Sequence, residues 1–379
     1  MSYGKDTILG IVLVALIGIL AAQKASNLSK LWHENEPLSF NLRVLFAKAA
    51  FPPVEAILDK PMDVQVEYWA KNTRFMEFGS KVFTAINSKS PLYAASYGPH
   101  PTRTSNLAIA SADNPDYLIP AICAAPHDAV VETKLPLILY FYMGGLVSGS
   151  PETELPISRW LAQEAHAVVC SVGYRKVPEF PYPTPINDVV DASIGILEQR
   201  VSVASLLGIG IDFDRVATWG MSAGGYMGAQ ATRRLAEHGY KLKCQVSLVP
   251  MAKPHGGAQS MLKNWDDLWS GTSNVYAWAM FLPGDDGTLA NDWRVSLIVD
   301  PPEEVIANLP PAYIQINKRD ILHDEGEMYA KKLKAQGKLI ELREYDVSHV
   351  GSHPDFAKGG SAEDGMDHAV SILKEYLYN

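Results

Sequence analysis

Cysteine is scarce in this sequence, which has three cysteines among its 379 residues. Cys123, Cys170 and Cys244 lie far apart and form neither a CxxC pair nor the spacing of a zinc site. Cys170 and Cys244 fall within apolar, strand-like runs, where a buried and unreactive thiol is the usual state. We therefore expect no disulfide framework and no bound metal.

Clusters of basic residues, internal repeats and low-complexity tracts are also lacking. The formal net charge is −9 at pH 7, whereas a surface that binds nucleic acid needs clustered Lys and Arg. Hydrophobic residues make up 47% of the chain and charged residues 20%, which is ordinary globular composition. The composition therefore argues against a nucleic-acid partner and against bulk disorder.

One long apolar run is present near the N-terminus. Residues 7–22 carry no charge and lie between Asp6 and Lys24. A membrane-spanning helix usually has about 20 apolar residues, with about 17 as the lower limit. Only Lys5 precedes the run, so the basic n-region of a cleaved signal peptide is weak. We interpret the run as a single-pass membrane anchor, with the endoplasmic reticulum as a candidate membrane; the alternatives are secretion after signal cleavage and a buried helix.

The rest of the chain alternates between short apolar runs and amphipathic stretches. The runs predict strands at 117–125, 135–143, 167–174, 215–221, 243–250, 312–317 and 340–347. The amphipathic stretches predict helices at 155–165, 185–207, 223–238, 324–337 and 363–377. Continuously apolar strands separated by helices are typical of an α/β fold with a mostly parallel central sheet flanked by helices.

Two regions interrupt this alternation and are expected to form a helical cap over the sheet. Residues 24–104 are helical in pattern and rich in aromatics, and 251–305 are rich in Trp, Gly and Asp. The predicted organisation is an anchor or signal segment at 1–23, an N-terminal cap at 24–104, a core at 105–250 and 306–379, and a cap insertion at 251–305.

The segment from Gly220 to Gly224 reads G-x-S-x-G and follows a predicted strand directly before a predicted helix. This strand–turn–helix setting is that of a nucleophile elbow, in which small neighbours let the backbone turn tightly under the serine. The helix N-terminus stabilises negative charge developing on the hydroxyl. The sequence thus predicts Ser222 as a nucleophile, against the alternative of a serine in an ordinary turn.

A serine nucleophile needs a base and an orienting acid. The predicted strand 312–317 runs into Lys318-Arg319-Asp320, and the strand 340–347 runs into Ser348-His349. Because parallel strands end at one edge of the sheet, both side chains are expected beside Ser222. The rivals ranked below them are the acids Asp324, Glu325 and Asp346 and the histidines His353 and His368.

Glycines follow the central strand 135–143, at Gly144, Gly145 and Gly149. Backbone N–H groups at such a turn, together with the N–H after the nucleophile, can form an oxyanion hole. With these residues in place, the chain resembles the hormone-sensitive-lipase-like esterases of the α/β-hydrolase fold, including their arylacetamide-deacetylase-like members. The resemblance covers about residues 105–379 and rests on ordered blocks at 142–149, 174–181, 220–225 and 320–326, with Asp188 and His349.

This resemblance implies a catalytic triad of Ser222, Asp320 and His349. It also implies oxyanion donors at the N–H groups of Gly144, Gly145 and Ala223. Such enzymes hydrolyse carboxylic esters of small or medium acyl chains without a metal or another cofactor. Membrane-anchored relatives would suit residues 7–22.

The chain departs from the family pattern around the nucleophile. The family's His-Gly-Gly-Gly is Tyr142-Met143-Gly144-Gly145 here, and the Asp that usually precedes the serine is Met221. Methionine makes the walls of the site larger and more apolar, which points to a lipophilic small-molecule substrate. The cap aromatics at Trp265, Trp269, Tyr276, Trp278 and Phe281 either line a cavity or only pack the cap, and packing is the expected role.

Three functions follow as hypotheses. The first is a serine carboxylesterase that cleaves an ester of a lipophilic small molecule through an acyl-enzyme. In the second, the same triad cleaves a carbon–carbon bond, transfers an acyl group or serves another step of specialised (secondary) metabolite biosynthesis. The third is a non-catalytic ligand receptor on the same fold, which the presence of all three triad residues disfavours.

The anchor hypothesis predicts that alkaline carbonate leaves the protein in the membrane pellet, because an apolar helix stays in the bilayer when electrostatic contacts are lost. Immunoblotting of pellet and supernatant measures this partition. Full release into the supernatant would refute the anchor.

Overall fold

The computed structural model describes residues 61, 64, 65, 67, 68, 102–199, 201–264, 269, 271–351, 353 and 360–379. Residues 7–22, Trp265 and most of the expected N-terminal cap lie outside this part. Among the described residues, no helix has both the length and the apolarity that crossing a bilayer requires.

Eight strands form one sheet, in the spatial order β1-β2-β4-β3-β5-β6-β7-β8. Pairing is parallel from β4 through β3, β5, β6 and β7 to β8, and antiparallel between β1 and β2 and between β2 and β4. The mostly parallel sheet predicted from the sequence is confirmed. The strands are β1 (Thr102–Ala110), β2 (Leu118–Pro126), β3 (Lys134–Phe141), β4 (Val168–Val172), β5 (Gly210–Met221), β6 (Cys244–Leu248), β7 (Ala312–Asn317) and β8 (Leu339–Tyr345).

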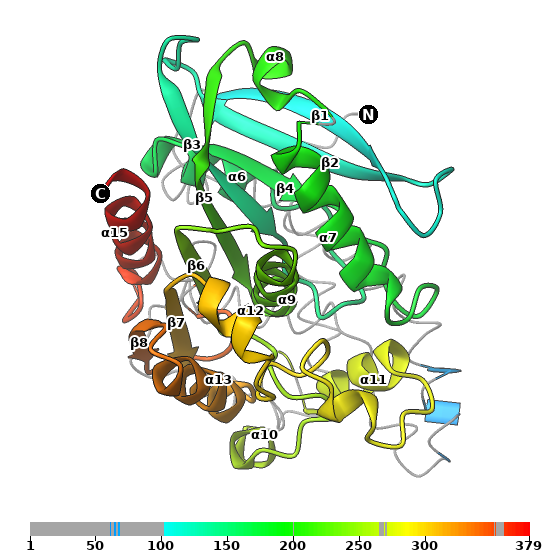
Figure 1. Cartoon of the computed structure of the whole chain (residues 1–379). Coiled ribbons are helices and arrows are strands. Elements are labelled where there is room, and N and C mark those ends of the chain that lie inside the picture. The colour runs from blue at the N-terminus through cyan, green and yellow to red at the C-terminus, as the bar shows by residue number, and fades with distance from the viewer. Residues whose placement is uncertain are drawn as a thin grey trace, which may run out of the picture.

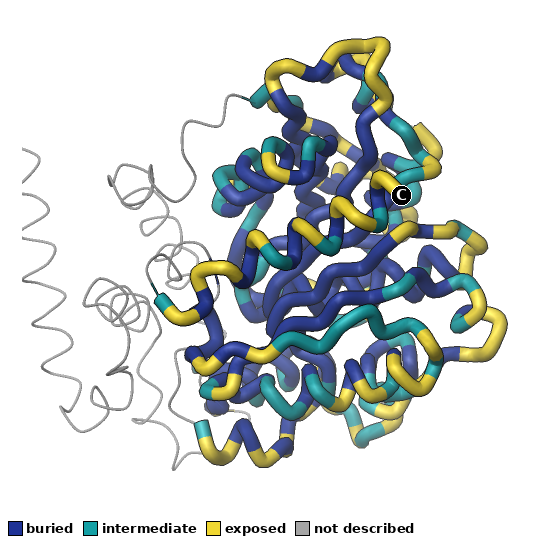
Figure 2. Tube along the Cα trace, turned by 90° about the vertical axis from the view of Figure 1, so that its left-hand side faces the viewer, coloured by how far each residue is buried: buried dark blue, intermediate teal, exposed yellow. Residues whose placement is uncertain are grey.

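Helices cover both faces of the sheet (Figure 1). The helices α7 and α9 pack side by side on one face, and α6 and α15 contact the same strands from the other face. The strands β4, β6 and β7 are buried at every position and β5 from Val216 onward, because the helices exclude water from both faces (Figure 2). The helices are α6 (Leu155–Glu164), α7 (Thr184–Leu197), α8 (Val203–Leu207), α9 (Ala223–Glu237), α10 (Gln259–Lys263), α11 (Gly271–Phe281), α12 (Glu303–Asn308), α13 (His323–Ala335) and α15 (Gly365–Tyr378), with a 3₁₀ turn at Leu289–Asn291.

Several elements differ from the sequence prediction, among them β5, which begins at Gly210 and not at residue 215. The edge strand β1 was not predicted; its residues alternate between exposed and covered, so it lacks the continuous apolar pattern of the inner strands. The predicted helix 185–207 is two helices, α7 and α8, because the chain turns at Gln199, whose φ is 56°. The short helix α12 lies partly within the expected insertion and packs against α9.

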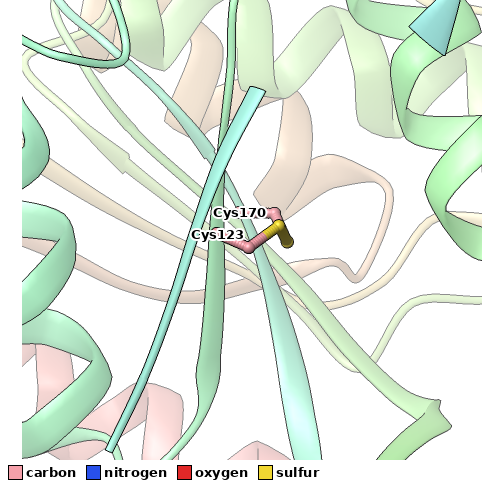
Figure 3. The surroundings of a disulfide bond; sticks show 2 residues. All are labelled: Cys123 and Cys170. Atoms are coloured by element: carbon pink, nitrogen blue, oxygen red, sulfur yellow. A yellow bond between two sulfur atoms is a disulfide. The ribbon is translucent and has the colours of Figure 1, made fainter. Parts of the chain in front are cut away.

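Cys123 and Cys170 form a disulfide bond (Figure 3). They lie on the antiparallel neighbours β2 and β4, directly opposite each other in the register. The expectation of an unreactive free thiol is therefore wrong for Cys170, as is the expectation that the cysteines stay unpaired. It is confirmed for Cys244, which is free and buried, and burial raises the pKa of its thiol. Spacing did not reveal the pair, because β2 and β4 are separated in sequence by β3 and meet only in the sheet.

The disulfide predicts a distinct thiol count. Alkylation of the denatured, unreduced protein should label Cys244 alone, and prior reduction should expose all three cysteines to the reagent. Reduction should also lower the free energy of unfolding by about 2–4 kcal/mol, since the bond closes a long loop. Intact-mass measurement counts the labels; three labels without reduction would contradict the bond.

Candidate active site

Ser222, His349 and Asp320 meet at the carboxyl edge of the parallel strands. Ser222 follows β5, Asp320 follows β7 and His349 follows β8. His349 Nε2 lies 2.8 Å from Ser222 Oγ, and His349 Nδ1 lies 2.7 Å from Asp320 Oδ2. A carboxylate accepts the proton on Nδ1, which leaves the Nε2 lone pair facing the serine hydroxyl. The three predicted residues thus form one hydrogen-bonded chain that can move a proton from serine to histidine.

Ser222 sits in a strained turn between β5 and α9. Its φ is 57° and its ψ is −124°, a conformation that non-glycine residues rarely adopt. The Ser222 N–H donates to the carbonyl of Leu248 at the end of β6 (2.8 Å). A side chain at Gly220 would collide with the Gly224 carbonyl, and one at Gly224 would collide with the Phe141 carbonyl. The glycines are therefore required by close backbone approach on both sides of the serine.

The acid and the base are held by buried hydrogen bonds. Asp320 Oδ1 accepts the N–H of Leu322 (2.9 Å), which orients the carboxylate toward His349. Asn317, the last residue of β7, donates from Nδ2 to the carbonyls of Ser348 (2.8 Å) and His349 (3.1 Å). Asn317 was not singled out from the sequence, although a polar amide at the end of an apolar strand is a signal that could have identified it.

Three of the rival side chains bind partners outside the predicted triad. Asp324 accepts the N–H of Ser260, Asp346 pairs with Arg319, and His368 pairs with Glu341. His353 is buried four residues beyond His349. Within the described part of the chain, no group of three or more His, Cys, Asp or Glu side chains could hold a metal ion.

The loop after β3 brings two further N–H groups near the nucleophile. Gly144 and Gly145 have φ values of 137° and 61°, which favour glycine. Among the described residues, neither N–H donates to a backbone carbonyl. The Ala223 N–H lies in the first turn of α9, where N–H groups have no partner within the helix. The contact of Gly224 with Phe141 places that first turn against the end of β3, so the three predicted donors lie in one region.

One aromatic side chain of the expected cap, Trp269, borders this region. The six-membered ring of Trp269 occupies the place of a Cβ on Gly145, and Trp269 Nε1 donates to Asn274 Oδ1 (3.4 Å). Trp278 and Phe281 instead pack against Tyr226 of α9. The cap aromatics thus divide into one ring that borders the glycine loop and others that pack the interior. Ser222 and His349 are only 4% and 3% exposed, so the site is shielded from bulk water.

Glu325 lies in the first turn of α13, where the sequence explained it only by the helix dipole. The structure buries this carboxyl completely, and burial raises its pKa to about 7. Glu325 Oε2 accepts the N–H groups of Ala252 and Lys253, each at 3.1 Å. The side chain therefore ties α13 to the segment that follows β6 beside the serine turn.

The raised pKa of Glu325 predicts a pH-dependent stability. The native state binds this proton more tightly than the unfolded state does, so the contribution of Glu325 to stability is full below about pH 4.5 and is lost as the pH rises through about 7. The loss at full ionisation is about 3 kcal/mol. Glu325→Gln should remove this component from the difference in unfolding free energy between pH 5 and pH 8, measured by urea denaturation. Glu327→Gln, at a partly exposed position on the same helix, is the matched control, and an unchanged pH dependence in Glu325→Gln would contradict the assignment.

Comparisons with known proteins agree with this fold. A family model described as alpha/beta hydrolase fold matches residues 138–351. An arylesterase from Saccharolobus solfataricus is 31% identical over 234 residues, which are 59% of this chain and 69% of that protein. A carboxylesterase, NlhH, from Mycobacterium tuberculosis is 31% identical over 252 residues, or 66% of this chain and 76% of that protein.

A solved structure shows the same fold. The thermostable esterase from Pseudomonas putida ECU1011 has a TM-score of 0.71 at 23% identity, over 92% of this chain and 99% of that one. The chain belongs to the alpha/beta hydrolase fold family, as the strand order, the matched residues and the similarity to curated esterases show.

Proposed function

We propose that the protein is a serine carboxylesterase that works through an acyl-enzyme. The observation that carries the proposal is the position of His349, within hydrogen-bond distance of both Ser222 Oγ and Asp320 Oδ2. The curated relatives that are named as an arylesterase and a carboxylesterase support cleavage of a carboxylic ester.

In this mechanism Ser222 Oγ attacks the ester carbonyl carbon while His349 Nε2 takes the hydroxyl proton. Asp320 orients the imidazole and stabilises its cation. The N–H groups of Gly144, Gly145 and Ala223 hold the tetrahedral oxyanion. His349 then protonates the leaving alcohol, and water repeats the cycle on the acyl-enzyme to release the acid and regenerate Ser222.

The proposed substrate is an ester of a lipophilic small molecule. Met221 is buried directly before the nucleophile, and Trp269 borders the glycine loop. Apolar walls of this kind favour apolar groups on either side of the ester. The proposal places the protein with the hormone-sensitive-lipase-like esterases, near the arylacetamide-deacetylase-like members, and involves no metal or other cofactor.

We also propose that residues 7–22 attach the protein to a membrane, with the endoplasmic reticulum as a candidate. A disulfide such as Cys123–Cys170 persists mainly in oxidising compartments, which favours a lumenal or extracellular location for the hydrolase. Secretion after cleavage of this segment is the alternative, and an intact N-terminus in the mature protein would distinguish the two.

The mechanism predicts that Ser222→Ala lowers kcat for p-nitrophenyl acetate by up to about a millionfold, because the nucleophile is lost. The variant should also fail to react with a fluorophosphonate probe. Ser371→Ala, an exposed position on α15, is the control and should keep both properties.

The outcomes separate the rival functions. Fluorophosphonate labelling at Ser222 without turnover of simple esters would favour carbon–carbon cleavage or acyl transfer. Ligand binding that Ser222→Ala does not affect, with no labelling of the native protein, would favour a receptor. Unchanged turnover in Ser222→Ala would refute the nucleophile.

A further inference from the structure

Tyr142 and Tyr174 form a reciprocal pair at the base of the glycine loop. Tyr142 directly follows β3, and Tyr174 lies two residues beyond the neighbouring strand β4. Their rings stack with centroids 4.3 Å apart and planes inclined by 5°. The Tyr142 hydroxyl donates to the Tyr174 carbonyl (3.1 Å), and the Tyr174 hydroxyl donates to the Tyr142 carbonyl (3.1 Å). The Tyr174 N–H also donates to the Tyr142 hydroxyl oxygen (3.2 Å).

This pair continues the contact between two strands after their backbone ladder ends. The parallel pairing of β3 with β4 extends to Tyr140 and Ser171. Beyond that point each phenol hydroxyl donates to the backbone of the segment that follows the other strand. We refer to the two side chains and their three hydrogen bonds as the tyrosine clasp.

The clasp is connected to both parts of the proposed oxyanion hole. The Tyr142 carbonyl belongs to the peptide plane that precedes Met143, so a hydrogen bond to that oxygen fixes the plane from which the loop begins. A side chain at Gly149, where the loop ends, would collide with the Tyr142 ring. A side chain at Gly224 would contact the Tyr142 carbonyl as well as that of Phe141, so the same peptide lies against the first turn of α9.

The loop has hydrogen bonds of its own, from the N–H groups of Val147 (3.1 Å) and Ser148 (2.9 Å) to the Gly144 carbonyl, but these close the loop on itself and do not attach it to its neighbours. Gly144 and Gly145 adopt left-handed conformations, but glycine also populates other regions of φ at little cost. The return side of the loop is tied to the same region, since the Val177 N–H donates to the Leu146 carbonyl (3.2 Å). The loop is therefore held between the segment that follows β4 and the start of α9.

The phenols are suited to act as permanent donors. Both side chains are buried, and burial raises the pKa of each hydroxyl above its ordinary value. The two groups therefore stay protonated across the pH range in which a serine–histidine pair works. A histidine at position 142, as in the family pattern, would be a donor whose charge changes near neutral pH.

We propose that Tyr142 and Tyr174 are positioning residues that hold the Gly144 and Gly145 N–H groups in the orientation that stabilises the oxyanion. The inference rests on the proposed esterase function and adds to it a cause for the loop geometry. The clasp acts through the loop and not by touching the substrate, so its effect is expected on the rate of acyl transfer and not on substrate binding.

Tyr142→Phe, Tyr174→Phe and the double variant test this proposal, because each keeps the stacked ring and removes a hydroxyl. We expect each single variant to lower kcat for p-nitrophenyl acetate by about ten- to a hundredfold while KM changes less than about threefold. The kcat of the double variant should be only slightly lower than that of the less active single variant, because the reciprocal bonds hold one loop as a unit. Complete fluorophosphonate labelling counts the folded sites, so that kcat is expressed per active molecule.

A trifluoromethyl ketone supplies a second readout, since its adduct with Ser222 carries an oxyanion. Its inhibition constant should rise across the variants by the factor by which kcat/KM falls. Tyr329→Phe is the matched control, because this buried tyrosine also has a hydrogen-bonded hydroxyl, which accepts from Gln245 of β6. The variant should keep its kcat and its ketone inhibition constant even if it is less stable. Variants that lose only thermal stability, with unchanged kcat and ketone affinity, would overturn the positioning role while leaving the esterase intact. A native protein that neither turns over the ester nor binds the ketone would overturn the proposed function and the clasp together.

Discussion

The site depends on one constraint, the close approach of backbone to backbone where β5 turns into α9. Gly220 and Gly224 have no side chains because the carbonyls of Gly224 and Phe141 occupy the space that a Cβ would need. This approach holds Ser222 in a strained conformation, and its hydroxyl lies within hydrogen-bond distance of His349 Nε2. It also brings the first N–H groups of α9 against the end of β3. A nucleophile and its oxyanion donors are thus products of the same turn.

The neighbouring strands supply the remaining parts of the site. The order β3-β5-β6-β7-β8 places the glycine loop on one side of the serine and the acid and base on the other. Each loop is then fixed by a buried polar side chain that takes no part in bond breaking: Tyr174 for the loop after β3, Glu325 for the segment after β6, and Asn317 for the turn that carries His349. Buried groups of this kind are costly unless they are hydrogen-bonded, so their bonds also specify one arrangement of the loops.

The sequence predicted the inner strands and the larger helices because their patterns are local. β7 is apolar at four of its six positions and is buried at every position, and α9 follows the glycine-rich turn at once. β1 was missed because an edge strand is covered on one face only. Ser222, Asp320 and His349 could be predicted as neighbours because each follows a parallel strand, and parallel strands end at one edge. Asn317 and Glu325 could not be given their roles, since these depend on the loop that each contacts.

By itself, the sequence determined the class of fold, the serine turn and the order of serine, acid and base. Each of these rests on a local pattern: the alternation of strands with helices, the glycines around the serine, and the position of each catalytic residue just after a strand. Only the tertiary structure decided which distant residues pair. Cys123 meets Cys170 because β2 lies beside β4, with β3 passing to its other side. Tyr142 meets Tyr174 because β3 and β4 run in parallel. Strand order is set by the packing of the whole sheet, and no local pattern encodes it.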